Sequence, residues 1–393
     1  MALNKQTLHS INAFVHEQLV PQESVFLSTP FQALQPQLNL LRKRVKESGW
    51  WAPHMPKKYG GMELTLMELA KVGMILGQTP IGHYCFGFQA PDAGNMEILK
   101  DFGTPEQKQK YLQPLVNGEI RSCFSMTEPD FAGSNPIHLA TTAVKDGGDY
   151  IINGHKWFTT GADGAEFAVV MCVTNPNGSK YGKASQIIVP TDTPGFERVR
   201  NISIMGEAGH GWNSHSEIRY HNVRVPQSNR IGAEGSGFLI AQKRLGPGRI
   251  HHCMRWIGIC ERALGMLCDR AISRNIDLDK PLSHKQTIQN WIAESRAQIE
   301  ASRLMVLEAA RQIDEDGDYA ARKYVSLIKF YVAQTMQEIL DRAIQTHGAL
   351  GITDDTPLAW WYRHERGSRI YDGPDEVHKV RVARLELKER SNS

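Results

Sequence analysis

The apolar residues in the first third of the chain recur at the spacing of an α-helix. Leu38, Leu41 and Val45 lie three or four positions apart, and residues 64–75 repeat this spacing. Side chains at such intervals line one face of a helix and leave the opposite face polar. We therefore predict that residues 1–122 form an N-terminal helical domain.

The last part of the chain has the same spacing over longer stretches. Residues 257–272 and 288–313 carry apolar side chains at three- and four-residue steps. Helices of this length usually pack as bundles, so we predict a C-terminal four-helix bundle over residues 236–393. The acidic segment 314–318 joins two of these helices. It lacks the ligand spacing of a calcium-binding loop, so no metal site is expected there.

The middle of the chain has a different pattern, in which short apolar runs alternate with Gly, Pro, Asn and Asp. Such runs are typical of β-strands joined by turns. The expected strands are residues 150–156, 168–174, 185–189, 196–202 and 216–225. The predicted fold class is therefore α+β multidomain, with a β-barrel or sandwich domain over residues 123–235 between the two helical domains.

Two local signals refine the helical part. Thr104 can cap a helix, Pro105 suits the first turn, and Gln107 completes a capping box. Residues 49–61 are expected to form a loop, whose glycines allow backbone angles that other residues avoid.

Composition and charge exclude several classes of protein. The chain has 393 residues, of which 41% are hydrophobic and 22% charged, as in an ordinary globular protein of two or three domains. The formal net charge is only +3, so nucleic acid is not an expected partner. No apolar run approaches the roughly 18 residues that a membrane span needs.

The ends of the chain and its cysteines favour a cytoplasmic location. The first residues lack the apolar centre of a secretory signal, and no Arg precedes Arg42. The six cysteines form no CxxC pair. We expect them to be reduced core thiols.

Residues 123–134 can form a binding loop in the middle segment. They begin as a strand, break at Glu128 and Pro129, and continue into a loop with Gly133 and Ser134. Such a loop can place a hydroxyl and several N–H groups around a polar ligand. Taken alone, it is also an ordinary β-turn.

A second stretch, residues 153–161, places two aromatic residues beside two hydroxyls. Trp157 and Phe158 are followed directly by Thr159 and Thr160. This combination suits a flat ring with a hydrogen-bonding edge. Alone, it too is consistent with a simple turn at the end of a strand.

The sequence lacks the common motifs of NAD-binding, nucleotide-binding and metal-binding proteins. No GxGxxG follows a predicted strand, which disfavours a dinucleotide-binding NAD enzyme, and no P-loop occurs. The adjacent pair His251 and His252, and the pair His210 and His215, lack partner ligands at metal-binding spacing. We interpret them as structural or surface histidines.

In their order along the chain, the segments beginning at Thr127, Gly133 and Asn153 resemble the flavin-binding core of the acyl-CoA dehydrogenase family. The resemblance extends over nearly the whole chain and includes the turn at residues 49–61 and the loop at residues 345–351. It implies the family's fold of helical domain, β-domain and helical bundle. It also implies FAD as cofactor and an acyl-CoA thioester as substrate.

The resemblance implies that residues of the β-domain surround the flavin ring. Met126 and Thr127 would line the ring, with Thr127 bonding its pyrimidine edge. Phe158 and Thr160 would cover the other face, and Ser134 would lie near the pyrophosphate and the thioester arm. The full set of implied cofactor-binding residues is Phe124, Met126, Thr127, Ser134, Phe158, Thr159, Thr160, Arg274, Gln286, Gln345, Gly348, Pro374 and Glu376.

Four of these residues imply a homo-oligomer. Arg274 and Gln286 resemble positions that reach the flavin's phosphates and adenine from a neighbouring subunit. Gln345 and Gly348 belong to a loop that resembles the family's contact with the neighbour's dinucleotide, with Ala349 in place of its second glycine. We therefore expect a homo-oligomer, either a dimer or a tetramer.

The catalytic base is implied by the segment 369–378, where relatives commonly have Ile-Tyr-Glu-Gly-Thr. Asp372 stands at the position of that Glu. Asp375 and Glu376 are nearby rivals, but as first-turn acids they suit the dipole of the next helix. Some family members carry the base on the helix that contains Arg249, and this segment has no carboxylate here.

Two departures from the family bear on the substrate. Asp372 is one methylene shorter than Glu, so the substrate or the backbone must come closer for proton transfer. Gly246 stands where many relatives carry an Asp that helps to hold CoA. The implied substrate contacts are Ser134, Arg249 and Gly373.

The resulting hypothesis is an FAD-dependent acyl-CoA dehydrogenase of fatty acid β-oxidation. It would form the trans-2-enoyl-CoA and pass electrons to electron-transfer flavoprotein. The end of the chain around Asp372 is most similar to the dehydrogenase part of acyl-CoA dehydrogenase family members 10 and 11. Two alternatives stay open: a nitroalkane-oxidase-like flavin oxidase, which Asp372 and Gly246 also fit, and a flavin- or lipid-binding scaffold without turnover.

Overall fold

The computed structural model of the protein describes residues 3–391 and comprises two compact units. The helical unit contains Met1–Trp50, Leu64–Phe86 and Arg249–Ser393, and the sheet unit contains Trp51–Glu63 and Gly87–Gly248. The N-terminal segment contributes to both units. The division of the chain into consecutive domains 1–122, 123–235 and 236–393 therefore stays a prediction.

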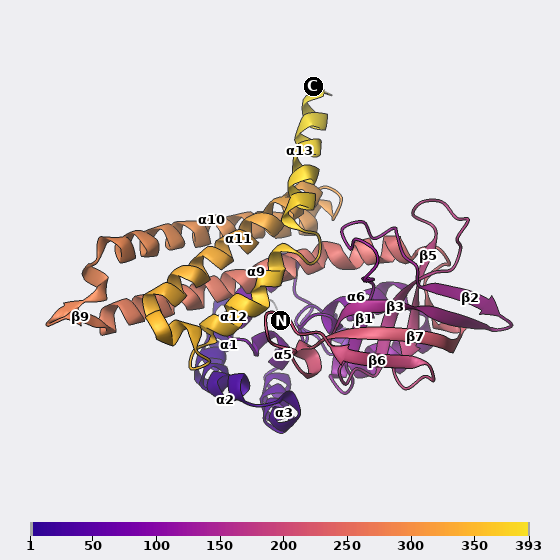
Figure 1. Cartoon of the computed structure of the whole chain (residues 1–393), viewed down its shortest axis with the longest axis horizontal. Helices are drawn as coiled ribbons and strands as arrows, with labels where there is room; N and C mark the ends of the chain where they lie inside the picture. The colour runs from indigo at the N-terminus through magenta and orange to yellow at the C-terminus, as the bar shows by residue number, and fades with distance from the viewer. Residues whose placement is uncertain (1–2, 392–393) are drawn as a thin grey trace. The chain divides into compact units, whose positions relative to one another are not determined.

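The helical unit is built mainly from long helices. Its elements are α1 (Lys5–Phe14), α2 (Glu23–Ser28), α3 (Phe31–Glu47), α4 (Leu66–Leu76), α5 (Gly82–Cys85), the part of α9 (Gly237–Ser273) from Arg249 onward, β9 (Asn275–Asp277), β10 (Lys280–Pro281), α10 (Gln286–Asp316), α11 (Arg322–His347), α12 (Pro357–Glu365) and α13 (Asp375–Ser391). Helices α10 and α11 run side by side, and the short β9–β10 hairpin precedes α10 (Figure 1).

One apolar core joins α9, α10 and α11. Trp256, Ile299 and Ile328 come from these three helices and are fully buried in a single cluster. Burial of a large apolar side chain stabilises the fold by about 1.5–3 kcal/mol. The helices predicted over residues 257–272 and 288–313 are confirmed, and both lie within longer helices.

Two glycines let α4 and α9 approach each other closely. A Cβ atom on Gly258 would lie 2.2 Å from the carbonyl oxygen of Met74, and one on Gly77 would lie 2.3 Å from that of Arg255. Real Cβ contacts are not that short, so any larger residue would push the two backbones apart.

The acidic segment predicted to be an inter-helix turn caps another helix. The Asp314 carboxylate accepts hydrogen bonds from the backbone N–H groups of Leu66 and Met67, both at 2.9 Å. These are the first two residues of α4, whose Thr65 and Glu68 also form a capping box. Asp314 therefore accepts hydrogen bonds from N–H groups that have no partner within α4. Its negative charge is also favourable at the positive end of the helix dipole.

We predict that Asp314→Ala destabilises the protein by about 1 kcal/mol, because two N–H groups of α4 lose their acceptor. The shift of the unfolding midpoint in urea measures this loss. Asp316→Ala is the matched control, since Asp316 ends α10 in the same turn and is exposed. Equal midpoints for the two variants would contradict the capping role.

The sheet unit contains one mixed eight-stranded sheet (Figure 1). Its strands are β1 (Ser122–Ser125), β2 (Thr142–Asp146), β3 (Asp149–Thr160), β4 (Phe167–Val173), β5 (Ala184–Pro190), β6 (Phe196–Asn201), β7 (His215–Pro226) and β8 (Arg230–Ile231), and its helices are α6 (Asp92–Phe102), α7 (Pro105–Gln107), α8 (Gln113–Asn117) and the start of α9. The strand order is β6-β7-β3-β2-β4-β5-β8, with β1 pairing parallel to β4.

The five predicted strands are confirmed as β3 to β7, with small shifts at their ends. Strand β2 was not predicted. Only Ala143 among its residues is buried, so its sequence lacks the alternation that identifies a half-buried strand. Its pairing with β3 in a tight antiparallel hairpin defines it instead.

The capping box at the start of α7 is confirmed. Thr104 Oγ1 accepts from the Gln107 N–H at 3.2 Å, and Gln107 Oε1 accepts from the Thr104 N–H at 3.1 Å. The loop predicted over residues 49–61 is also present, with Gly60 at φ 93°.

Within residues 3–391, no helix is both long and apolar enough to cross a bilayer. The six cysteines are free thiols, and burial raises the pKa of Cys85 and of Cys172 to about 12. In the same described range, no group of three or more His, Cys, Asp or Glu side chains is arranged to hold a metal ion.

Candidate active site

In the sheet unit, a buried ion pair fixes the chain directly after β1. Lys156 on β3 is fully buried and donates hydrogen bonds from Nζ to the Met126 carbonyl and to Glu128 Oε1, each at 2.8 Å. Glu128 also accepts from the N–H groups of Ala140 and Thr141, at 2.6 and 2.9 Å. The segment that leaves β1 is therefore tied at Met126 and again just before β2.

The pKa values of the pair show the cost of burying it. Burial lowers the pKa of Lys156, against the attraction of Glu128. Burial also acts to raise the pKa of Glu128, but Lys156 and the backbone donors outweigh it and hold this pKa below its usual value. Such a pair is expensive to break, because the remaining charge would have no partner.

A bulge in β3 turns Phe158 toward the surface. The pairing of β3 with β7 shifts register between Lys156 and Thr159, which is the signature of an extra residue in one strand. Phe158 has φ 48°, a left-handed backbone that is unfavourable for a bulky residue, and its side chain is 41% exposed. Strain of this kind is often found at functional sites.

The two threonines after Phe158 have different environments. Thr160 is half-buried, and its hydroxyl lies 2.9 Å from Nδ1 of His215. Thr159 is fully buried, and its hydroxyl lies 3.2 Å from that of Ser125, which accepts from Tyr220. Thr159 could therefore contact a ligand only through its backbone, whereas Thr160 also offers a side chain.

The remaining predicted residues of this unit differ in exposure. Met126 and Thr127 are half-buried, and Ser134 is exposed. The Phe124 ring lies 4.2 Å from the guanidinium carbon of Arg244, which covers one of its faces.

These residues fit a flavin ring. Thr127 and Thr160 supply hydroxyls and Phe158 supplies an exposed ring, which are the groups that a flat ring with polar edges requires. The indole N–H of Trp157 is buried without a hydrogen-bond partner among the described residues. An unsatisfied buried donor is costly, and a bound polar group would satisfy it.

In the helical unit, Asp372 lies in a tight loop, residues 371–374, which we call the Asp372 loop. Asp372 has φ 55° and Gly373 has φ 99°. Asp tolerates this left-handed backbone better than most residues, and a Cβ atom on Gly373 would lie 2.7 Å from Nε2 of His378. The loop therefore requires glycine at 373 and favours Asp or Asn at 372.

Three basic side chains contact Asp372. Its carbonyl oxygen accepts from Arg249 Nε at 2.9 Å and lies 3.1 Å from His378 Nε2. Its carboxylate oxygen Oδ2 lies 3.2 Å from Nε2 of His252, and the side chain is 21% exposed. Asp372 is thus held at both its backbone and its side chain, yet it is not sealed from solvent.

A buried lysine donates hydrogen bonds to the backbone of the Asp372 loop and of the residues before it. Lys329 on α11 is fully buried and donates from Nζ to the carbonyl oxygens of Ser368 and Gly373, at 2.6 and 3.2 Å. Burial lowers the pKa of Lys329, and the nearby Asp372 opposes this effect. The ammonium group therefore fixes the loop and adds positive charge close to the carboxylate.

The rival carboxylates have other roles. Asp375 is buried and accepts hydrogen bonds from Arg369 Nε at 2.7 Å and from Gln334 Nε2 at 2.9 Å. Glu376 is exposed. Both lie in the first turn of α13, where acids are favoured.

The residues implied to reach a neighbouring subunit are all exposed. Arg274 directly follows α9, and Gln286 begins α10. Gln345 lies in the last turn of α11, and Gly348 ends that helix with φ 64°. These four residues therefore lie on the surface, at the ends of α9, α10 and α11.

Sequence reasoning missed the buried charges of both units. Lys156 interrupts an otherwise apolar strand face, and Lys329 stands among the buried residues Ile328 and Val332. A charged residue at a core position is the signal that could have found them, because such charges are almost always paired.

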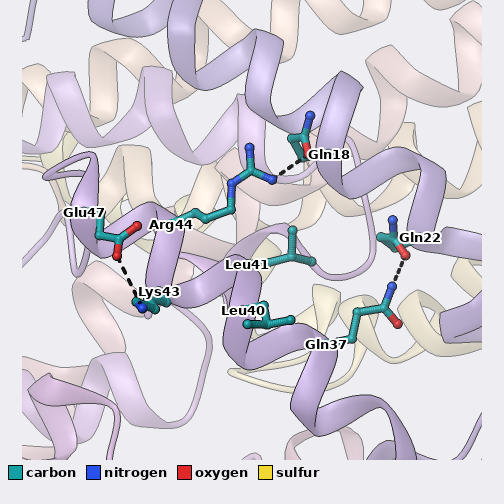
Figure 2. A pocket seen from close by; sticks show the side chains of 8 residues that line it. All are labelled: Gln18, Gln22, Gln37, Leu40, Leu41, Lys43, Arg44 and Glu47. Carbon is teal, nitrogen blue, oxygen red and sulfur yellow. Dashed lines mark hydrogen bonds and ion pairs between the residues drawn. The ribbon is translucent and has the colours of Figure 1, made fainter.

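A surface hollow in the helical unit contains none of the predicted site residues. Arg44 donates to Gln18 at 2.7 Å across it, and Gln37 donates to Gln22 (Figure 2). The side chains around it are mostly polar and pair with one another. Nothing there is suited to catalysis.

Three family models match the chain. The N-terminal, middle and C-terminal domains of acyl-CoA dehydrogenase match residues 4–119, 123–223 and 235–387. The probable acyl-CoA dehydrogenase FadE2 of Mycobacterium tuberculosis is 45% identical over 90% of this chain and 86% of its own. Acyl-CoA dehydrogenase family member 11 of Gallus gallus is 43% identical over 91% of this chain but only 46% of its own, so the chain spans about half of that relative.

A solved structure agrees with these matches. A candidate acyl-CoA dehydrogenase from Mycobacterium abscessus has a TM-score of 0.94 and 36% identity, over 99% of this chain and 100% of its own. The three matched domains, in this order, are those of a class of flavoprotein oxidoreductases that act on acyl-CoA. The chain belongs to the acyl-CoA dehydrogenase family.

We predict that Glu128→Gln lowers stability by about 3 kcal/mol or more, because it leaves the Lys156 ammonium buried without its charged partner. Thermal unfolding of the purified protein measures the loss. The double variant Glu128→Gln with Lys156→Met should lose less than the single one.

The matched control is Glu234→Gln, which breaks the exposed ion pair with Lys145 in the same unit. Exposed pairs contribute less than about 1 kcal/mol. A single Glu128 variant as stable as this control would contradict the role of the buried pair.

Proposed function

We propose that the protein is an FAD-dependent acyl-CoA dehydrogenase that removes the α-proton of its substrate with Asp372. The observation that carries this proposal is the Asp372 loop. Its carboxylate is partly exposed, its backbone is held by Arg249 and His378, and Asp375, the nearest buried rival, is already bonded to Arg369.

A carboxylate in this setting can act as a general base. Loss of water on substrate binding would raise the proton affinity of Asp372 toward the working pH. The basic groups of Arg249 and Lys329 favour the ionised form before the substrate arrives. We also propose that the backbone N–H of Asp372 would bind the thioester oxygen, where negative charge develops as the proton leaves.

The proposed flavin contacts are those of the sheet unit, above all Thr127, Phe158 and Thr160. FAD, when bound, supplies the acceptor for the hydride that leaves the β-carbon. The buried pair of Glu128 and Lys156 would hold the Met126–Thr127 backbone for it. Phe124 and Ser134 are proposed as further contacts, and Ser134 would also meet the thioester arm.

Further proposals follow from family membership. Arg274, Gln286, Gln345 and Gly348 would bind the dinucleotide of a neighbouring subunit, which makes a homo-oligomer the functional form. The exposure of all four is consistent with this role. Pro374 and Glu376 would add contacts from the Asp372 loop, and Arg249 and Gly373 would contact the substrate.

The physiological setting is proposed on the same basis. Electron-transfer flavoprotein would be the electron acceptor, the pathway fatty acid β-oxidation, and the compartment the cytoplasm. The substrate is an acyl-CoA thioester whose chain length and branching are to be determined with a substrate panel.

We predict that Asp372→Asn slows flavin reduction by acyl-CoA at least about a hundredfold, the usual scale for the loss of a general base. Asn keeps the left-handed backbone, so FAD content and folding should be unchanged. Anaerobic stopped-flow absorbance at the flavin band measures the rate. Asp372→Glu restores a carboxylate and should retain much more activity.

The control for the mutation is Asp355→Asn, an exposed aspartate in the same unit, which should reduce its flavin at the wild-type rate. Reduction of the Asp372→Asn protein at a rate near that of the wild type would place the base elsewhere, with Glu376 the next residue to test.

A further inference from the structure

We propose that His252 is a positioning residue that fixes the carboxylate of Asp372 for proton removal. His252 lies on α9, and its Nε2 is 3.2 Å from Oδ2 of Asp372. The inference rests on the proposed function of Asp372 and assigns a role to a histidine that the sequence alone predicts to be structural or on the surface.

The contact is largely shielded from solvent. The side chain of His252 is 17% exposed and that of Asp372 is 21% exposed. A hydrogen bond in such an environment is stronger than one in water, because the local dielectric constant is lower. It therefore restricts the carboxylate more than an exposed pair would.

The neighbours of His252 determine which ring nitrogen carries the proton. Arg255 places a guanidinium nitrogen 3.5 Å from Nδ1 of His252. That nitrogen already donates to Glu365 Oε2 and to the Tyr371 hydroxyl, so the assignment comes from the Asp372 carboxylate, which can only accept and therefore places a proton on Nε2. The Nε2–H of His252 then donates to Oδ2 of Asp372.

Arg255 is itself held firmly. Its guanidinium forms a two-point ion pair with Glu365, which is fully buried, and donates to the Tyr371 hydroxyl at 3.2 Å. Trp256 Nε1 donates to the same carboxylate at 3.0 Å. The chain of contacts thus runs from the buried Glu365 through Arg255 and His252 to Asp372.

Two aromatic rings fix the plane of the imidazole. The ring of His252 stacks on Trp256, with centroids 5.8 Å apart and an interplanar angle of 16°. Tyr371 packs against it at 5.0 Å. Because the ring cannot turn freely, Nε2 stays directed at the Asp372 carboxylate.

The charged and titratable groups around this pair come from every neighbouring element. They are Arg249, His251 and Arg255 on α9, His83 on α5, Lys329 on α11, Glu365 on α12, Tyr371 in the Asp372 loop and His378 on α13. Burial lowers the pKa of His251 to about 3 and that of His378 to about 4. Burial raises the pKa of Tyr371, so these three groups stay neutral between about pH 5 and 9.

The consequence for catalysis is a fixed orientation of the Asp372 carboxylate. The Nε2–H donor favours the ionised carboxylate and holds one of its oxygens in a fixed direction. His252 cannot take the proton from Asp372 at Nε2, because that nitrogen already carries one. It is therefore not the base, and its loss should affect the rate of proton removal more than substrate binding.

The test measures flavin reduction by a saturating acyl-CoA in anaerobic stopped flow, as a function of pH, in the full-length FAD-loaded protein. His252→Leu removes the donor. We expect the limiting rate to fall at least about tenfold, the scale of a misplaced catalytic group, with little change in substrate affinity. The apparent pKa of the rate profile should rise, because the Asp372 carboxylate loses a donor that favours its ionised form.

Two further variants separate positioning from a loss of packing. The amide nitrogen of Gln can reach the place of Nε2, whereas the shorter Asn cannot, so His252→Gln should recover most of the rate and His252→Asn should not. His9→Gln changes an exposed histidine of the same unit; it is the control and should keep the wild-type rate and pH profile.

A His252→Leu or His252→Asn protein with wild-type rate and pH profile overturns the positioning role. Equal losses in the Gln and Asn variants also overturn it, since packing alone would then explain the effect. A wild-type protein that no acyl-CoA reduces would instead overturn the proposed function, and the inference with it.

Discussion

The buried ion pair of Arg255 and Glu365 is the interaction on which the Asp372 loop depends. It joins α9 to α12 and also holds the Tyr371 hydroxyl and the Trp256 indole. Two charges removed from water stabilise a fold only when their hydrogen bonds are satisfied, and here the surrounding donors meet that condition. The Asp372 loop, which follows α12, is therefore fixed in place. Its residues Asp372 and Gly373 can then keep the left-handed backbone that positions the carboxylate.

Much of the fold could be predicted because the long elements carry strong periodic patterns. Residues 257–272 and 288–313 specify helices in which Ile257 and Ile299 are buried. The strands β3 and β7 alternate between buried and exposed positions, and β4 and β5 are continuous buried runs. The exposed strand β2 has no such alternation and depends on its hairpin with β3. The cap from Asp314 to α4 could not be predicted either, because it joins residues about 250 positions apart along the chain.

The residues of the candidate site that belong to short sequence motifs could be predicted. The contacts between residues far apart in the sequence could not. Asp372 and Thr160 stand in short recognisable segments, and their roles in catalysis and flavin binding stay predictions. His252 and Asp372 are in contact although they lie 120 positions apart in the sequence. No local sequence pattern can predict such a contact. Thr159 is buried and Thr160 is not, because of the bulge beside Phe158. This difference could not be predicted from the sequence either.

The most direct test of the account is an anaerobic titration of the FAD-loaded wild-type protein with a panel of acyl-CoA thioesters. The account predicts that at least one thioester bleaches the flavin fully, at about one equivalent, without rapid oxygen consumption when air is admitted. Fast oxygen uptake with nitroethane and no bleaching by any thioester would contradict it and indicate a nitroalkane-oxidase-like enzyme. Bleaching by neither class would indicate a binding protein without turnover.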